Sequence, residues 1–225
     1  MNYVFDEKFS RYGEVVNQFD FTGVVELMKG VQVDKGIKQT ESARELECRK
    51  VFEEVQEKLF NGKEIQVGWC LGHNHKINMV EYHKTCQLFI TASDCVMFFG
   101  EKKNMEFNQV YNTKYMEGFF IPKGTALKIN PEVLHCTPCN INSYGFKVIS
   151  VNVRHTNEPL EIQTGDRKDR TLFANREAGV EGAFCGLKGD TIAVYQKTQN
   201  HQFSPKTKNI YTLFYPVSYT HLTLP

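Results

Sequence analysis

The sequence predicts an all-β core, built as a barrel or a sandwich and preceded by helices. Three observations support this fold class. Between residues 64 and 153, short runs rich in Val, Ile, Phe and Tyr alternate with turn residues. No segment of helical periodicity separates these runs, which excludes the alternating strands and helices of a parallel α/β sheet. The residues before the first run, in contrast, show the spacing of amphipathic helices.

Composition places the chain among ordinary soluble proteins and excludes several classes of function. The 225 residues carry a formal net charge of +1, with 41% hydrophobic and 24% charged residues. A nearly neutral chain lacks the basic character of a nucleic-acid binder, and intrinsic disorder is not expected at this composition. No apolar run approaches the roughly 18 residues that a membrane-spanning helix needs. We therefore expect neither a nucleic-acid nor a membrane partner.

The cysteines and the first residues indicate the cytoplasm. The seven cysteines are odd in number and scattered, so we expect reduced thiols rather than a disulfide scaffold. Residues 1–8 become charged at once and contain no apolar core of a secretory signal. We expect a cytoplasmic protein and keep a homodimer open as its assembly state.

The N-terminal extension, residues 1–62, is expected to be helical and irregular and to pack on the β core. Thr22 can cap a short helix that runs to Lys29. A longer helix is predicted from about Glu41 to Phe60. Its apolar residues recur mostly every three or four positions, with Glu and Lys between them, so one stripe should be buried.

The β core is assigned to residues 63–155, and we expect a jelly-roll barrel there. The strand-like runs in it are bounded by turn residues and follow one another closely, which is typical of such barrels. These runs are 64–70, 77–83, 86–92, 95–100, 117–121, 125–130, 133–136 and 145–153.

The chain after residue 155 divides into two parts. Residues 156–216 are polar and loop-like, apart from a strand-like piece near 191–195, and are expected to wrap the core. Residues 217–225 read VSYTHLTLP, and SYTHLTLP is the in-frame translation of a transposase adapter used in sequencing libraries. We expect this segment to be foreign to the natural protein, so His221 is not counted as a functional histidine.

Deleting residues 217–225 should leave the midpoint of thermal unfolding unchanged, because a translated adapter has no reason to pack on the fold. Calorimetry of the full and shortened chains measures the difference. A fall of several degrees, equivalent to about 1 kcal/mol, would show instead that these residues stabilise the fold.

Histidines concentrate in the β core, most densely in the segment GHNHKINMVEYHKTCQ at residues 72–87. Side chains alternate along a strand, so Glu81, His83 and Gln87 are expected to share one face. Residues two apart on a strand are close enough for both side chains to reach one ion. A further histidine, His135, lies in PEVLHCTPCN at residues 131–140.

These two segments resemble the two signature motifs of the cupin superfamily. In the first motif, His83 matches the second histidine, Glu81 stands at the first histidine, and Gln87 stands at the glutamate. The residues that match the second motif, with small shifts, are Gly124, Pro131, His135 and Asn140. Over nearly the whole chain, the sequence is similar to an uncharacterised bacterial branch of cupins known only as a domain of unknown function.

The resemblance implies a metal centre with an altered set of ligands. His83, His135 and Glu81 supply two imidazoles and one carboxylate, which hold Zn, Mn(II) or Fe(II) with open positions for substrate. Gln87 is a weak neutral oxygen ligand at best, or it forms hydrogen bonds to the ligands without contacting the metal. Alternatively, both histidines are core residues bonded to backbone, and Glu81 pairs with a neighbouring lysine.

The remaining candidates are assigned to the substrate. His73, His75 and Asn78 are expected to contact it, and Lys76 and Glu117 to move a proton. His73, His75 and Glu117 also have simpler interpretations, because loop histidines are commonly exposed and a carboxylate that begins a strand can be a solvated group at the rim.

The sequence thus predicts a metal-dependent enzyme that acts on a small polar metabolite. The resemblance implies a sugar, a sugar acid or a keto acid as substrate, isomerase, epimerase or lyase chemistry, and Zn, Mn or Fe as cofactor. Two alternatives stay open. An Fe(II) dioxygenase would use the same ligands and consume oxygen. A non-catalytic cupin that binds a small ligand would explain why Gln87 replaces the usual glutamate.

Overall fold

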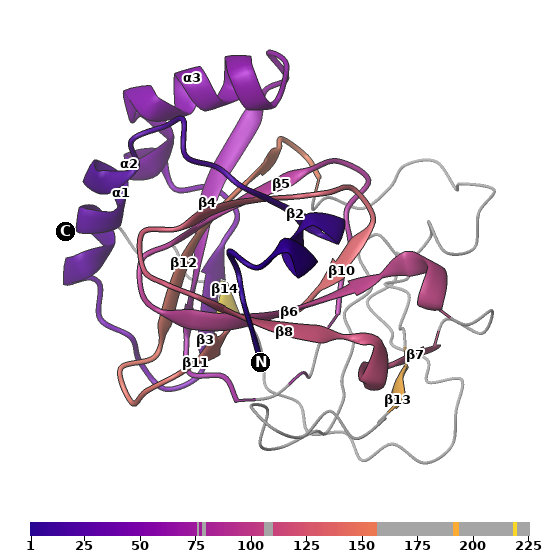
Figure 1. Cartoon of the computed structure of the whole chain (residues 1–225). Helices are drawn as coiled ribbons and strands as arrows, with labels where there is room; N and C mark the ends of the chain where they lie inside the picture. The colour runs from indigo at the N-terminus through magenta and orange to yellow at the C-terminus, as the bar shows by residue number, and fades with distance from the viewer. Residues whose placement is uncertain (76, 78–79, 106–109, 157–190, 194–217, 220–225) are drawn as a thin grey trace, which may run out of the picture.

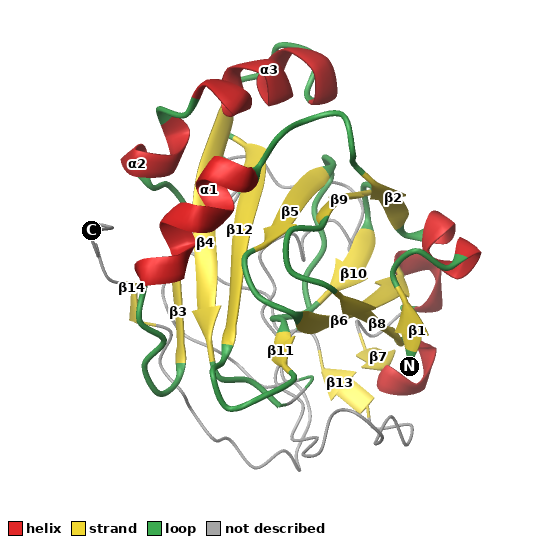
Figure 2. Cartoon of the chain, turned by 60° about the vertical axis from the view of Figure 1, so that its left-hand side comes forward, coloured by secondary structure: helices red, strands yellow, loops and turns green. Residues whose placement is uncertain are grey.

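The computed structural model describes residues 1–75, 77, 80–105, 110–156, 191–193 and 218–219. Within them, two β-sheets face each other as a sandwich, and short helices cover the outside of one sheet (Figures 1 and 2). The prediction of a mostly β protein with N-terminal helices is therefore confirmed.

Sheet A has the strand order β1-β8-β6-β10, and β11 also pairs with β6. All of its pairings are antiparallel except that of β1 with β8. Its strands are β1 (Asn2–Tyr3), β6 (Cys95–Glu101), β8 (Glu117–Ile121), β10 (Val133–His135) and β11 (Cys139–Asn140).

Sheet B has the strand order β14-β3-β4-β12-β5-β9-β2 and is antiparallel apart from β14. Its strands are β2 (Gly13–Val15), β3 (Ile37–Thr40), β4 (Ile65–Gly72), β5 (Gln87–Thr91), β9 (Ala126–Ile129), β12 (Phe146–Val153) and β14 (Ser218–Tyr219). A separate pair joins β7 (Val110–Asn112) to β13 (Thr191–Ala193). The two residues of β14 pair with Lys38 and Gln39, while the rest of the proposed adapter lies outside the described residues.

The expected barrel is replaced by an open sandwich. Among the described strands, none pairs with both sheets, so sheets A and B stay separate. The N-terminal extension also contributes strands that the helical interpretation did not foresee: β1, β2 and β3 lie at or near the sheet edges.

The predicted strands are observed with one exception, the segment 77–83, of which the structure describes residues 77 and 80–83. Among these described residues only Glu81 forms a backbone bridge, to His135. Its apolar residues Ile77, Val80 and Tyr82 are buried in a cluster with Phe98 and Leu134, on the side of sheet A that faces away from sheet B. The alternation of polar and apolar residues there reflects burial against a sheet face rather than strand pairing.

The helices cover the outer face of sheet B. They are α1 (Thr22–Leu27), α2 (Arg44–Glu47) and α3 (Lys50–Leu59), and short 3-10 turns stand at 7–11, 28–30, 102–104 and 113–115. The single helix predicted from 41 to 60 is interrupted at Arg49, whose backbone is extended. Leu46 and Phe52 are both buried. Residues six apart do not lie on one face of a continuous helix. The break at Arg49 therefore allows both side chains to pack on the sheet.

The core has layers on both faces of sheet B. On the outer face, Phe52 and Val55 of α3 pack in one cluster with Trp69 and Ile149 of the sheet. Between the sheets, aromatic side chains such as Phe89, Phe99 and Phe119 form a second cluster. Because side chains alternate, strands β4, β5 and β12 send every second residue into this interior, where the candidate site lies.

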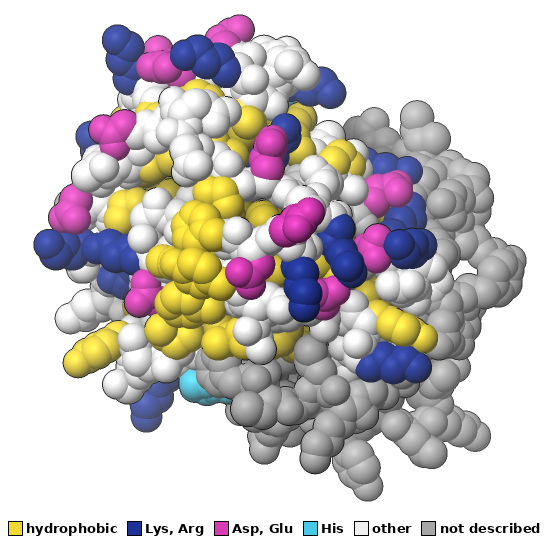
Figure 3. Space-filling view, viewed as in Figure 1, with side chains coloured by type: hydrophobic (Ala, Val, Ile, Leu, Met, Phe, Trp, Pro, Cys, Tyr) yellow, Lys and Arg dark blue, Asp and Glu magenta, His cyan; other side chains and the backbone are white. Residues whose placement is uncertain are grey.

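The surface gives two further observations. None of the helices in the described part of the chain is long and apolar enough to cross a membrane. On the face seen in Figure 3, acidic and basic side chains are interspersed around a central group of hydrophobic side chains.

Replacing Phe52 by alanine should lower the free energy of unfolding by about 3–5 kcal/mol, because the change opens a cavity between α3 and sheet B. Urea denaturation measures this loss. The exposed neighbour Glu53 provides the control, since Glu53→Ala should change stability by about 0.5 kcal/mol or less. Equal effects of the two substitutions would contradict the packing described for α3.

Candidate metal centre

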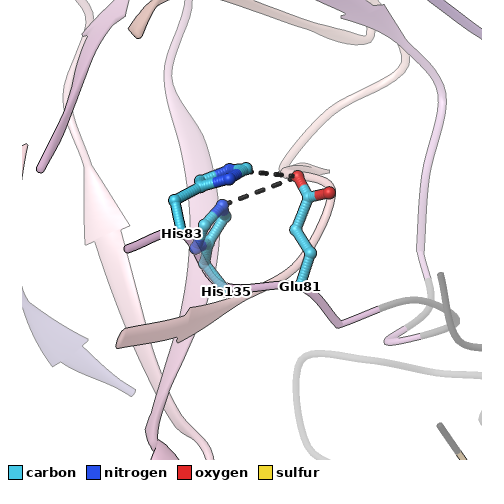
Figure 4. A group of neighbouring side chains, drawn as sticks. All are labelled: Glu81, His83 and His135. Atoms are coloured by element: carbon cyan, nitrogen blue, oxygen red, sulfur yellow. Dashed lines mark ion pairs between the residues drawn. The ribbon is translucent and has the colours of Figure 1, made fainter. Parts of the chain in front are cut away.

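Three predicted ligands converge in the interior of the sandwich. Glu81, His83 and His135 each offer one ligand atom, and these atoms all lie within 4.8 Å of one another. Glu81 Oε1 is 3.6 Å from His135 Nε2 and 3.9 Å from His83 Nε2 (Figure 4). The structure therefore brings these three predicted ligands together, and their binding of a metal stays a prediction.

Backbone hydrogen bonds position Glu81 and His135. The N–H of each residue donates to the carbonyl of the other, both at 2.9 Å, in the manner of an antiparallel bridge. In such a pair the two side chains project to the same side. His135 is opposite Phe99, a residue of the aromatic core, so this side is the interior.

His83 is carried into the same space by its position two residues after Glu81. Its carbonyl accepts a 2.7 Å hydrogen bond from the N–H of Glu132, which ties the segment to the turn before β10. The imidazole of His83 lies 5.3 Å from that of His135, measured between ring centroids. The local sequence and this second tether thus place both rings beside the carboxylate.

The nitrogen atoms that face the centre have no hydrogen-bond partner. Nδ1 of His135 lies 3.1 Å from the carbonyl of Val133, so a proton on Nδ1 leaves the lone pair of Nε2 directed at the centre. Among the described residues, Nε2 of His135 and both ring nitrogens of His83 are buried without a partner. Buried polar atoms without partners are costly and call for an explanation.

Burial and mutual charge set the ionisation of the group. Burial lowers the pKa of His83 to about 4, against the attraction of Glu81, so His83 is neutral at pH 7. Burial alone would raise the pKa of Glu81, but the adjacent imidazoles of His135 and His83 outweigh it and hold that pKa well below its usual range. A neutral imidazole beside a carboxylate is the state that binds a metal.

The geometry fits a divalent metal. Metal–nitrogen and metal–oxygen bonds of about 2.0–2.2 Å place the ligand atoms of one ion about 3–3.5 Å apart. The separations of 3.6 and 3.9 Å from Glu81 Oε1, with all three ligand atoms within 4.8 Å of one another, need an inward adjustment of about 1 Å or less at each ligand. About a third of the Glu81 side chain, 31%, is accessible, whereas each histidine side chain is 4% accessible, so the centre is reached from the Glu81 side.

Other predicted site residues lie elsewhere. His75 is exposed, with Nε2 3.5 Å from Nδ2 of Asn140. His73 lines a separate pocket of about 610 Å³, together with Lys29 and Lys147. Neither histidine belongs to the metal-ligand group found in the described residues. Lys76 and Asn78 fall outside the described residues.

Glu117 is engaged in a different part of the fold. Its carboxylate accepts hydrogen bonds from Arg11 at 2.8 Å and from the hydroxyl of Tyr12 at 3.1 Å. Burial, together with this carboxylate, raises the pKa of Tyr12 to about 12. Along sheet A, Phe99 stands between Glu117 and His135, so the structure does not bring Glu117 to the candidate centre.

Gln87 is the first residue of β5 and is 5% exposed. Nearby residues that the sequence interpretation missed come from the same sheet. Phe89 of β5 meets His135 edge-on at 5.5 Å between ring centroids. Burial raises the pKa of the Cys70 thiol on β4, and the charge of Glu81 raises it further. Strand alternation places these residues on one face, but only the packing of the two sheets shows that this face meets the histidines.

Comparison with known proteins assigns a family. A family model described as Domain of unknown function (DUF4867) matches residues 1–192. The chain belongs to the DUF4867 family. No curated protein matches this DUF4867 chain.

Solved structures show partial likenesses to the DUF4867 chain. Hydroxypropylphosphonic acid epoxidase from S. wedmorenis has a TM-score of 0.29 and 19% identity, covering 39% of this chain and 41% of that one. The plu4264 protein from Photorhabdus luminescens has a TM-score of 0.28 and 18% identity, covering 39% and 60%. CapF, solved with the inhibitor 3-isopropenyl-tropolone, has a TM-score of 0.31 and 18% identity, covering 40% and 25%. The matches span less than two thirds of these chains, so function is argued from the site itself.

The metal-free DUF4867 protein should lose stability as the pH falls from about 6.5 to about 4. In the folded chain the pKa of His83 is about 4. Within this pH window the unfolded chain therefore binds a proton at His83, whereas the folded chain does not. The loss attributable to His83 is roughly 3 kcal/mol. Urea denaturation across this window measures it.

His83→Gln should flatten this part of the profile, because glutamine does not titrate. An unchanged slope in that variant would assign the acid sensitivity to another group.

Proposed function

We propose that this DUF4867 protein is a metal-dependent enzyme of the cupin type that acts on a small polar metabolite. The observation that supports it is the convergence of two imidazoles and one carboxylate with buried, unpartnered nitrogen atoms. A purely structural histidine pair would be expected to satisfy these atoms with backbone or side-chain partners.

Each residue of the centre has a separate task. Glu81, His83 and His135 would hold a divalent cation, and Glu81 would neutralise part of its charge. The hydrogen bond between Nδ1 of His135 and the Val133 carbonyl would keep the opposite nitrogen available. When bound, the cation supplies Lewis acidity that polarises a carbonyl and acidifies the adjacent C–H.

The reaction proposed first is an isomerisation, an epimerisation or a lyase reaction of a sugar, a sugar acid or a keto acid. This chemistry needs a group that moves a proton beside the substrate carbonyl. Glu117 is bound to Arg11 and Tyr12, which disfavours it for this task. Lys76 stays the proposed proton carrier, and Asn78 a proposed substrate contact.

An Fe(II) dioxygenase is the second candidate, favoured by the ligand set itself. Two histidines and one carboxylate with open positions are typical of non-haem Fe(II) oxygenases. Oxygen-electrode measurements with the Fe(II)-loaded protein and candidate substrates separate the two functions. Substrate-dependent oxygen consumption would favour the dioxygenase, whereas turnover without oxygen would favour the isomerase or lyase.

Glu81→Gln should weaken binding of Mn(II), Fe(II) or Zn(II) by about 10–100-fold, because it removes the negative charge from the centre and keeps the shape of the side chain. Calorimetric titration of the metal-free protein measures the affinity. Glu117→Gln is the matched control and should bind metal as the wild type does, since its carboxylate is held at the N-terminal segment.

Equal affinities for the wild type and Glu81→Gln would remove Glu81 from the centre. Metal binding to the wild type without any turnover would support the non-catalytic ligand-binding alternative instead.

A further inference from the structure

The inner face of sheet B is polar at one end of its strands, next to Phe89. The outward residues of β4, β5 and β12 pack on the helices, so the alternate residues face sheet A. At one end of the strands these inward residues are buried amides and a hydroxyl instead of the aromatic and aliphatic side chains of the remaining interior. They are Gln66, Gln87, Ser150 and Asn152.

Strand register groups these residues closely. Asn152 is opposite Gln66, and Ser150 is opposite Phe89. Strands β12 and β5 pair Val151 with Leu88. Continuing this antiparallel register by one residue places Asn152 beside Gln87. Two amides therefore lie side by side on the inner face.

Phe89 connects this amide pair to the centre. It is two residues after Gln87 on the same face of β5, and its ring contacts that of His135 at 5.5 Å. Phe89 therefore lies between the amide pair and His135.

The oxygen atoms of these two neighbouring amides have no hydrogen-bond partner among the described residues. Oε1 of Gln87 and Oδ1 of Asn152 are buried and accept no hydrogen bond from the described residues. Gln87 is 5% exposed and Asn152 is 2% exposed. Gln66, in contrast, is satisfied, because its Oε1 accepts a 3.1 Å hydrogen bond from the N–H of His155. Unpartnered oxygens at two adjacent positions are a destabilising feature that a ligand could relieve.

We propose that Gln87 and Asn152 form the substrate-binding pair that recognises the uncharged, hydroxyl-bearing end of the substrate. The inference rests on the proposed function, in which the centre binds the other end. It assigns to Gln87 a contact with substrate instead of a contact with metal.

The chemistry of this face selects the class of substrate. In β4, β5, β9 and β12, none of the inward residues carries a charge. Amides and a hydroxyl exchange hydrogen bonds with hydroxyl and carbonyl groups, but they cannot compensate the desolvation of a second carboxylate or a phosphate. A polyhydroxylated chain with one metal-binding end fits both parts of the site.

The first test is stability without any ligand. Gln87→Met and Asn152→Leu keep the shape of each side chain and remove a buried, unpartnered polar group, so each should raise the melting temperature of the metal-free protein. Gln66→Met is the matched control and should lower it, because that amide accepts the hydrogen bond from His155. If Gln87→Met and Asn152→Leu lower the melting temperature as the control does, both amides are structural and the proposal is wrong.

The second test uses three five-carbon probes with the same 2-hydroxy acid end. Xylonate carries a hydroxylated chain, 2-hydroxypentanoate an apolar chain, and 2-hydroxyglutarate a second carboxylate. Calorimetry with the Mn(II)-loaded wild type should show the tightest binding for xylonate. Each variant should bind xylonate about tenfold more weakly and 2-hydroxypentanoate without loss. Unchanged xylonate affinity, or tighter binding of 2-hydroxyglutarate by the wild type, would overturn the proposal.

Metal titration separates this proposal from the proposed function. Both amide variants should bind Mn(II) as the wild type does, and a loss like that of Glu81→Gln would make Gln87 a metal ligand and refute its role here. If the wild type itself binds no metal, the proposed function fails, while the stability test still decides whether the amides are functional or structural.

Discussion

The backbone bridge between Glu81 and His135 is the contact on which the candidate site depends. Residues 80–83 lie outside the named strands, and two reciprocal hydrogen bonds of 2.9 Å attach Glu81 to β10. An antiparallel bridge directs both side chains to one side, so the carboxylate and the imidazole lie next to each other. His83 follows in the same segment, with its carbonyl bound to the N–H of Glu132. The chemistry is thus positioned by main-chain geometry.

The interior of the sandwich contains an apolar core that stabilises the fold and, at the candidate site, buried polar atoms that lower its stability. Phe89, Phe99 and Phe119 belong to the apolar cluster between the sheets, and the helices bury the outer face of sheet B in another. Against this background, the interior retains imidazole and amide atoms that have no partner in the described part of the chain. Proteins retain such local violations where function requires them, and packing elsewhere offsets their cost. The position of these atoms, around Phe89 and His135, is what links them to one site.

Much of the fold followed from local patterns, and the errors have physical causes. Strands such as 95–101 and 146–153 were predictable because short apolar β runs end at turn residues. The run 77–83 has the same alternation in sequence, but Val80 and Tyr82 are buried against sheet A, and among its described residues only Glu81 bridges to a strand of that sheet. The interactions of Glu117 could not be predicted from local sequence either, because its partner Arg11 lies 106 positions away in the sequence.

The sequence by itself determined the β core, the amphipathic character of the N-terminal helices and the identity of the three candidate ligands. These features depend on spacing within a few residues, which side-chain alternation and helical periodicity translate directly into faces. The tertiary structure alone decided that the sheets stay open, that Glu117 is distant from His135, and that Asn152 lies beside Gln87 on a polar face. Those features depend on register between strands far apart in the chain, which no local pattern specifies.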